Sequence, residues 1–218
     1  MKVITLPPPP VNRQEILRYA SCPKELASSL PLEDCLRLAE EQISCRVCWE
    51  RSPLHISGAQ VDMGFAAVRS AGLAKALEGC SSVLIFAATV GLGIDRLILR
   101  YERVSPLWAL TLHAIGAERI ESLCDAFCWE FSCELAADGE TLRPRYSPGY
   151  GDLPLAFQQD LFRALDCERR IGLTLTQGLA MSPAKSVTAI AGIGKGFCGT
   201  RKAGCASCGL KDCAFRRS

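Results

Sequence analysis

Residues 82–89 read Ser-Val-Leu-Ile-Phe-Ala-Ala-Thr, a nearly continuous apolar run that is rich in strand formers. Such a run is typical of a strand buried inside a sheet. The residues that follow, 90–95, contain two glycines and predict a turn into a helix over 95–101. A buried strand requires a sheet on which other elements pack.

A much longer helical pattern follows this strand. Ser105-Pro106 marks its start, and apolar residues recur at three- and four-residue steps to about Ala136. About thirty residues of helix span ~45 Å. This helix is expected to be the backbone of the fold.

Shorter elements are expected around these two. Helices are predicted over 13–19, behind a capping-box-like Asn12 and Glu15, and over 31–42, 70–77 and 155–169, with strands in 47–61 and 185–191. Strands and helices do not alternate regularly. The predicted class is therefore α+β: a mixed or antiparallel sheet packed with helices, including one long central helix, plus a cysteine-rich C-terminal tail.

Composition excludes several classes of protein. The 218 residues are 49% hydrophobic and 22% charged, with 25 Lys and Arg against 23 Asp and Glu. This balance excludes a disordered chain and argues against a wholly basic nucleic-acid binder. No apolar segment of signal-peptide length precedes the four prolines at 7–10, and the longest uncharged run, 79–94, is shorter than the ~20 residues that span a bilayer. A cytoplasmic protein is expected.

The unusual feature of the composition is its 13 cysteines. Four of them, Cys198, Cys205, Cys208 and Cys213, are spaced C-x6-C-x2-C-x4-C. A C-x2-C pair lets two thiolates reach one ion from a tight turn, and the outer cysteines would complete a four-cysteine shell. From Lys195 onward six basic residues accompany one acidic residue, which suits the negative charge of such a site. A metal site is expected there.

The spacing does not identify the metal. An iron–sulfur cluster, a zinc ion and a thiol-rich tail without metal stay open, and the cluster is favoured because zinc sites usually show two compact cysteine pairs. The expected division is a folded domain over 1–194 and a four-cysteine metal-binding tail over 195–218. Cys45 and Cys48 have the spacing of a redox pair but no thioredoxin-like context, and the other cysteines are expected in the core.

The segment Arg143-Pro-Arg-Tyr-Ser-Pro-Gly-Tyr-Gly-Asp-Leu-Pro154 is a second candidate site. Its three prolines restrict the backbone, and an arginine held there can bind a carboxylate with two hydrogen bonds. Gly149 and Gly151 let a ligand approach the main chain. The same composition also suits a plain surface turn.

Three motifs, in this order, resemble the activation domain of cobalamin-dependent methionine synthase. Arg145-Tyr-Ser-Pro-Gly-Tyr150 matches R-x-x-x-G-Y, Glu168 to Thr176 matches E-x-x-x-G-x-x-L-T, and Met181 to Val187 matches M-x-P-x-x-S-V. The specific match covers 143–194, and the pattern over 73–135 is compatible with small standalone relatives of that domain. The family is identified by the three motifs together rather than by any one of them.

The resemblance implies a standalone activation domain over 1–194 that binds S-adenosylmethionine. It implies that Arg145 anchors the methionine carboxylate, that Gly149 and Tyr150 lie against the ligand, and that Tyr150 stands between the methyl donor and the cobalt of a partner. The implied role is reductive methylation of cob(II)alamin on a separate corrinoid protein or methionine synthase, with the four-cysteine iron–sulfur site as a candidate electron donor.

The sequence departs from the family pattern at two positions. Gln177 stands where the full-length enzymes commonly have Glu, and Ser182 where they have Trp. The acidic partner of the ligand's ammonium or sulfonium is therefore unassigned, with Asp152 and Glu168 as weak candidates. The cobalamin-binding D-x-H-x-x-G motif is missing, so the cobalamin is expected on a partner. The alternative is a non-catalytic binding module with a structural zinc knuckle.

Overall fold

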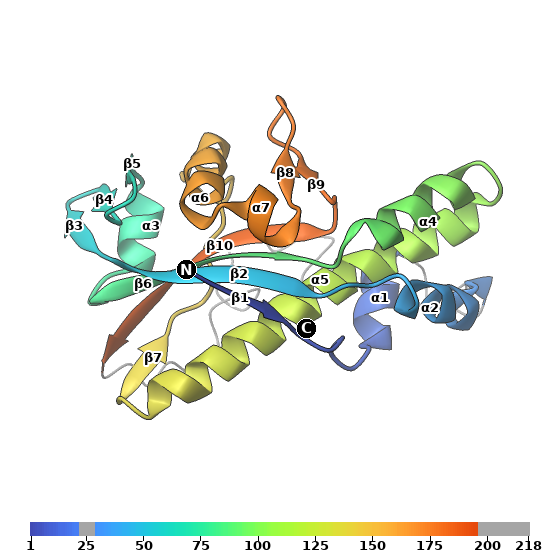
Figure 1. The fold of residues 1–218 in the computed structure, drawn as a ribbon, viewed down its shortest axis with the longest axis horizontal. Coiled ribbons are helices and arrows are strands. Elements are labelled where there is room, and N and C mark those ends of the chain that lie inside the picture. Colours follow the sequence, from blue (N-terminus) through green and yellow to red (C-terminus); the bar gives the residue numbers. More distant parts are fainter. Residues whose placement is uncertain (22–28, 196–218) are drawn as a thin grey trace.

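The computed structural model describes residues 1–21 and 29–195. Its centre is a five-stranded sheet in the order β1-β2-β6-β10-β7, in which every pairing is antiparallel (Figure 1). This confirms the predicted class and decides between a mixed and an antiparallel sheet. The strands are β1 (Lys2–Thr5), β2 (Arg46–Pro53), β6 (Ser82–Thr89), β7 (Glu140–Leu142) and β10 (Ser186–Lys195).

Strand β6 is the middle strand, and every one of its residues is buried. Leu84 and Phe86 belong to the core on one face of the sheet, and Val83 and Ile85 belong to the core on the other. Because both faces are covered, the strand reads as a continuous apolar run instead of an alternating one. The strand predicted over 82–89 is confirmed at both ends.

Helix α5 (Pro106–Ala136) covers one face of the sheet, and both of its predicted ends are confirmed. Its aromatic side chains pack on the strands: the ring of Phe127 lies 5.1 Å from that of Phe86, and Phe131 lies 5.0 Å from Trp49. Among the described helices, α5 included, none is long and apolar enough to cross a membrane. Packed against α5 are α1 (Arg13–Tyr19), α2 (Leu32–Glu40) and α4 (Leu92–Glu102).

The opposite face of the sheet is covered by a second group of short elements (Figure 1). They are α3 (Ala71–Ala76), the 3₁₀ turn η2 (Leu155–Phe157), α6 (Gln158–Leu165) and α7 (Cys167–Ile171). Two small antiparallel sheets extend from this layer, formed by β3 (His55–Ser57), β4 (Gln60–Asp62) and β5 (Ala67–Arg69), and by β8 (Thr174–Leu175) and β9 (Met181–Ser182).

Two predictions about the elements were wrong. The helix expected over 155–169 is broken, because Asp166 adopts a left-handed conformation with φ 48° and ends α6 before α7 begins. The short strands β1 and β7 were not predicted, although β1 pairs with β2 and β7 pairs with β10. Both are edge strands of three or four residues, too short for an apolar alternation to stand out.

The cysteines divide between the two cores. Cys45 belongs to the core under α5, whereas Cys48 belongs to the core on the opposite face of the sheet. The two therefore do not form the redox pair that their C-x-x-C spacing suggested. Cys48 instead shares its core with Cys167 of α7. Of the other cysteines, which were expected in the core, Cys35, Cys124 and Cys167 are buried as predicted, and Cys80 and Cys128 are partly buried. The prediction is wrong for Cys133, which is exposed near the end of α5.

A buried ion pair on α5 holds the N-terminal segment in place. The side chains of Glu118 and Arg119 pair with each other and are 2% and 3% exposed. Arg119 also donates to the carbonyl oxygens of Pro9 and Pro10, and Glu118 accepts from the main-chain N–H of Asn12 at 3.0 Å. Both charges are thus satisfied, and α1 begins directly beside α5.

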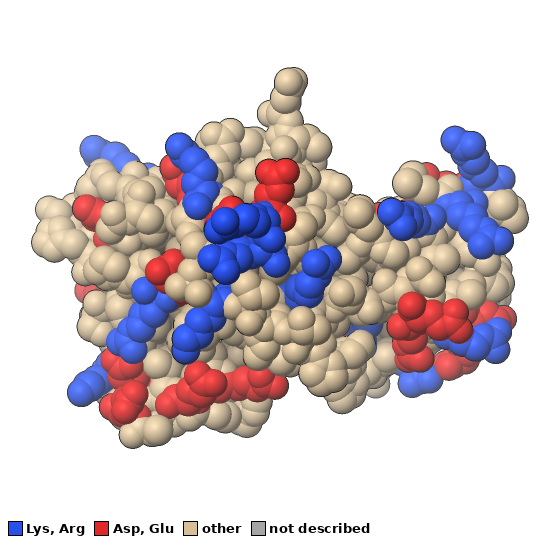
Figure 2. All heavy atoms as spheres, viewed as in Figure 1, with Lys and Arg blue, Asp and Glu red and all other residues tan. Residues whose placement is uncertain are grey.

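The surface charges are mixed. On the face seen in Figure 2, basic and acidic side chains lie interspersed in small groups and do not form one field of a single sign. Several are neighbours on the same helix, such as Arg163 with Asp160 at 2.6 Å and Arg37 with Asp34 at 2.7 Å.

Candidate functional site

The first residues of the Arg143–Pro154 segment run along β10 and pair with it at Arg143 and Tyr146. Tyr146 donates to and accepts from the main chain of Ile190, at 2.8 and 2.9 Å. Successive side chains of an extended chain point to opposite faces. Arg145 accordingly reaches towards α5, while Tyr146 packs on the core of the opposite face.

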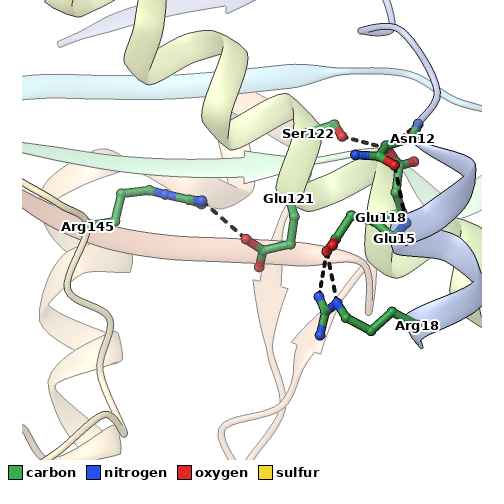
Figure 3. A network of polar contacts seen from close by, with 7 residues as sticks. All are labelled: Asn12, Glu15, Arg18, Glu118, Glu121, Ser122 and Arg145. Carbon is green, nitrogen blue, oxygen red and sulfur yellow. Dashed lines mark hydrogen bonds and ion pairs between the residues drawn. The ribbon is translucent and has the colours of Figure 1, made fainter. Parts of the chain in front are cut away.

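Arg145 lies against α5 and meets two carboxylates, of which that of Glu121 is drawn in Figure 3. Its Nη2 donates to Asp125 Oδ1 at 2.6 Å and to Glu121 Oε2 at 3.1 Å. Its Nε and Nη1 make no hydrogen bond with any other residue that the structure describes. The Arg145 side chain is 20% exposed, so the guanidinium is partly shielded from water but still reachable.

A cavity of about 170 Å³ lies between α1 and α5, next to this ion pair. Glu118 at its wall is already engaged by Arg119, Asn12 and Ser122, and Glu15 is engaged by Arg18 (Figure 3). Glu121 and Asp125 line the same cavity, and the ion-pair partner of both carboxylates is Arg145. The lining residues are Asn12, Glu15, Tyr19, Glu118, Glu121, Ser122 and Asp125.

Neither Glu121 nor Asp125 was identified from the sequence. They lie four residues apart in the middle of the long helix, where they read as ordinary solvent-facing charges. Nothing in a single sequence shows that an arginine twenty residues further on folds back onto them. The signal that existed was their i, i+4 spacing on one face of a helix that is otherwise largely buried.

Gly149 and Tyr150 lie at the tip of a tight loop. Gly149 and Gly151 have φ values of 86° and 57°, a left-handed conformation that glycine adopts without strain. The N–H of Gly149 donates to Leu153 O at 2.9 Å and closes the loop. Tyr150 is 63% exposed, and its ring stands edge-on to Tyr146 at 5.3 Å. Among the described residues, no hydrogen bond or ring contact joins Tyr150 to Arg145.

The two acidic residues suggested earlier as ligand partners have other positions. The carboxylate of Asp152 accepts hydrogen bonds from Ser70 Oγ and from the N–H groups of Ala71 and Gly72 at the start of α3. These hydrogen bonds, above all that from Ser70, hold the pKa of Asp152 below its usual value. Glu168 is exposed on α7. The structure thus places Asp152 at a helix N-terminus, away from Arg145.

Lys185, from the third motif, packs its stem over Gly116 of α5. A Cβ at position 116 would lie only 3.0 Å from the Lys185 side chain, so this stem fits because residue 116 is glycine. Its Nζ lies 3.3 Å from His113 Nδ1. Burial lowers the pKa of Lys185, and the charge of Asp95 partly offsets this.

The four tail cysteines, Cys198, Cys205, Cys208 and Cys213, lie outside the described residues, so their metal site stays a prediction. Within 1–21 and 29–195 no group of three or more His, Cys, Asp or Glu side chains is arranged to hold a metal ion. The expected tail boundary falls inside a strand, because β10 continues to Lys195.

The chain is similar to known proteins both in sequence and in fold. The family model described as "Vitamin B12 dependent methionine synthase, activation domain" matches residues 74–195. A solved structure described as "Crystal Structure of the MetH Reactivation Domain bound to AdoHcy" is similar, with a TM-score of 0.59 and 13% identity, over 88% of this chain and 77% of that one. At that identity the likeness shows a shared fold.

No curated protein sequence matches the chain. The family model nevertheless spans more than half of it, from α3 to the end of β10, and includes Glu121, Arg145 and Tyr150. The chain belongs to the family of vitamin B12-dependent methionine synthase activation domains.

Proposed function

We propose that this chain binds S-adenosylmethionine beside α5 and supports the reductive methylation of cob(II)alamin held by a separate corrinoid protein or by a cobalamin-binding methionine synthase module. The observation that carries the proposal is Arg145, a partly buried guanidinium from the family motif with two N–H-bearing nitrogens unbonded to other described residues. The similar solved structure is described with S-adenosylhomocysteine bound, which supports this ligand class.

The charges around Arg145 suit the amino-acid end of the ligand. The unbonded nitrogens of Arg145, Nε and Nη1, can donate to the ligand's carboxylate, and charge-assisted pairs of this kind are the strong ones. Glu121 and Asp125 offer carboxylates to its ammonium group and to the positive sulfonium. One arginine between two acids thus complements a zwitterion with an additional positive charge.

Tyr150 suits a place between the methyl donor and a planar corrin. It is 63% exposed and lies at the loop tip next to Gly149. A large partner surface can therefore reach it without displacing the core. In the proposed site Arg145 and Gly149 hold the ligand, and Tyr150 contacts the reacting face.

The proposed methylation of cob(II)alamin takes two steps, a reduction and a methyl transfer. One electron from a low-potential donor converts cob(II)alamin to cob(I)alamin on the partner. The electron pair of cob(I)alamin then attacks the methyl group, the C–S bond breaks, and methylcobalamin and S-adenosylhomocysteine are formed. The methyl transfer is effectively irreversible, and it draws the unfavourable reduction forward. The protein's part is to hold the donor methyl in line with the cobalt.

We further propose that residues 195–218 form a four-cysteine metal site with Cys198, Cys205, Cys208 and Cys213 as ligands, and that an iron–sulfur cluster there would supply the electron. The support is the cysteine spacing and the basic surroundings. Protein isolated without oxygen should then be brown and contain iron. A colourless protein with stoichiometric zinc would remove the electron-transfer part and leave a structural zinc knuckle.

The function itself is tested by methyl transfer. The chain is mixed with a methionine synthase module loaded with cob(II)alamin, a titanium(III) reductant and methyl-labelled S-adenosylmethionine, and methylcobalamin is followed by its absorption. We expect labelled methylcobalamin to form faster when the chain is present. If the reductant produces cob(I)alamin but the chain leaves the rate unchanged, the proposed function is wrong.

A further inference from the structure

The loop that carries Tyr150 is tied to a distant helix. Asp152 accepts hydrogen bonds at 2.5 Å from Ser70 Oγ and at 2.7 Å from the N–H of Ala71, about eighty residues earlier in the chain. The N–H of Gly72 donates to the same carboxylate at 3.1 Å. One side chain thus binds the first turn of α3 to the loop, and Asp152 lies outside the R-x-x-x-G-Y motif.

Tyr146 fills the remaining space between the loop and α3. A Cβ placed on Gly72 would lie 2.6 Å from the Tyr146 hydroxyl oxygen and 2.8 Å from Asp152 Oδ1. The backbone of Gly72 has no left-handed φ, so glycine is required there for space and not for conformation. Ser70, Gly72, Tyr146 and Asp152 together form what we call the loop clamp.

The loop clamp adjoins the turn that carries Tyr150. Tyr150 is 63% exposed, and within the described chain its one ring contact is with Tyr146. Its backbone is fixed by the turn from Ser147 to Leu153, in which the N–H groups of Tyr150 and Leu153 donate to Ser147 O and Tyr150 O, each at 3.1 Å. Two side chains attach this turn to the rest of the molecule: Asp152 through its hydrogen bonds to the start of α3, and Leu153, which is buried in the core on that face of the sheet.

We propose that Asp152 is a positioning residue for Tyr150: through the loop clamp it holds the Gly149–Tyr150 tip in the orientation that the methyl donor requires. This inference rests on the proposed function, in which Gly149 and Tyr150 contact the ligand. An anchored loop loses less conformational freedom on binding, so the clamp would raise affinity through preorganisation.

Two variants break the clamp in different ways. Asp152→Asn keeps the shape of the side chain but replaces one of its two accepting oxygens with an NH2 group, which cannot accept from the N–H groups of α3. Gly72→Ala adds a methyl group in the space occupied by Tyr146 and Asp152, although alanine favours helix over glycine and should not weaken α3 itself. The matched control is Asp62→Asn, because Asp62 accepts from the N–H of Gly64 at 2.8 Å in a turn remote in sequence from the loop.

Two measurements on the full chain decide the proposal. Amide hydrogen exchange at Gly149, Tyr150 and Leu153 should become about fivefold faster in both clamp variants and stay unchanged in the control, as loss of one capping interaction implies. Affinity for S-adenosylhomocysteine should fall by a similar, roughly fivefold factor in both clamp variants and stay unchanged in the control.

The possible outcomes distinguish a failure of the loop-clamp proposal from a failure of the proposed function. Unchanged exchange at the loop amides would show that Asp152 does not hold the loop, and faster exchange with parent-like affinity would show that it does not position Tyr150 for the ligand. Either result overturns the proposal. If the parent chain binds no S-adenosylhomocysteine, the proposed function fails first, and the exchange data still decide whether the clamp exists.

Discussion

Arg145 belongs to a group of three charged side chains, together with Glu121 and Asp125. It lies between Glu121 and Asp125 and remains only 20% exposed, so its charge is compensated by the protein before any ligand arrives. When a zwitterionic ligand binds, its carboxylate can replace Glu121 and Asp125 as the partner of Arg145, and its ammonium group can replace Arg145 as the partner of the two acids. No buried charge is then left unpaired. This exchange is the physical reason for assigning the site to an amino-acid group.

Replacement of Glu121 by Gln should distinguish the two ligand forms. The sulfonium of S-adenosylmethionine carries a positive charge that S-adenosylhomocysteine lacks, so loss of the carboxylate should weaken S-adenosylmethionine more, by about tenfold or more. Calorimetric titration of both ligands measures the ratio. Glu130→Gln, an exposed acid on the same helix, is the control and should change neither affinity. Equal losses for both ligands would show that Glu121 does not face the sulfonium.

The lowered pKa of Lys185 predicts that the free energy of unfolding depends on pH. Because burial lowers its pKa in the folded state, the unfolded chain binds more protons between that lowered pKa and the ~10.4 of an ordinary lysine. The free energy of unfolding should therefore rise with pH in this window, and the cost of the buried charge is fully present below it. The groups that face Lys185 are His113 and Asp95.

Urea unfolding of the parent and of Lys185→Met at pH 7 and pH 10 tests this. The variant should gain stability at pH 7, because its apolar stem still packs over Gly116 without a charge to desolvate. The advantage should shrink at pH 10. An advantage that is the same at both pH values would mean that Lys185 has an ordinary pKa.

At the scale of elements, α5 has two different sides. One packs on the sheet through Phe127 and Phe131, and the other holds the N-terminal segment through Glu118 and Arg119. The cavity beside Glu121 exists because Glu118 keeps α1 next to α5. The helix thus supports the site as well as the core.

Removing the buried carboxylate on α5 should be costly. Glu118→Ala leaves the guanidinium of Arg119 buried without its charged partner, and breaking a buried pair in this way costs about 3–5 kcal/mol. Thermal or urea unfolding measures the loss, and Glu130→Ala, exposed on the same helix, should cost less than about 0.5 kcal/mol. Similar losses in the two variants would contradict the structural role of the Glu118–Arg119 pair.

The long, periodic elements were predictable and the irregular ones were not. The strand 82–89 and the helix 106–136 have their predicted ends, because both patterns extend over many residues and end at turn or capping residues. The break at Asp166 was missed because an aspartate in the left-handed region has no unique sequence signal. Edge strands β1 and β7 depend on pairing with distant strands, which local sequence does not specify.

In the molecule as a whole, the antiparallel sheet separates the face covered by α5 from the face covered by α3, α6 and α7, and each face carries residues of the proposed site. Arg145 and the acids of α5 lie on one side, and Tyr146 with the loop clamp lies on the other, so the Arg143–Pro154 segment connects both. Sequence motifs identified this segment and the family. They did not reveal Glu121, Asp125 or the role of Asp152, because these residues meet the segment only through the fold.

Calorimetric titration of the full chain with S-adenosylmethionine tests the central claim most directly. We expect one binding site per chain, with affinity that Arg145→Ala lowers by about 1.5–3 kcal/mol because a charge-assisted contact is lost. Arg163→Ala, which removes an exposed arginine paired with Asp160 on α6, should leave the affinity unchanged. Absence of binding by the parent chain, or equal affinity in Arg145→Ala, would contradict the assignment of the site.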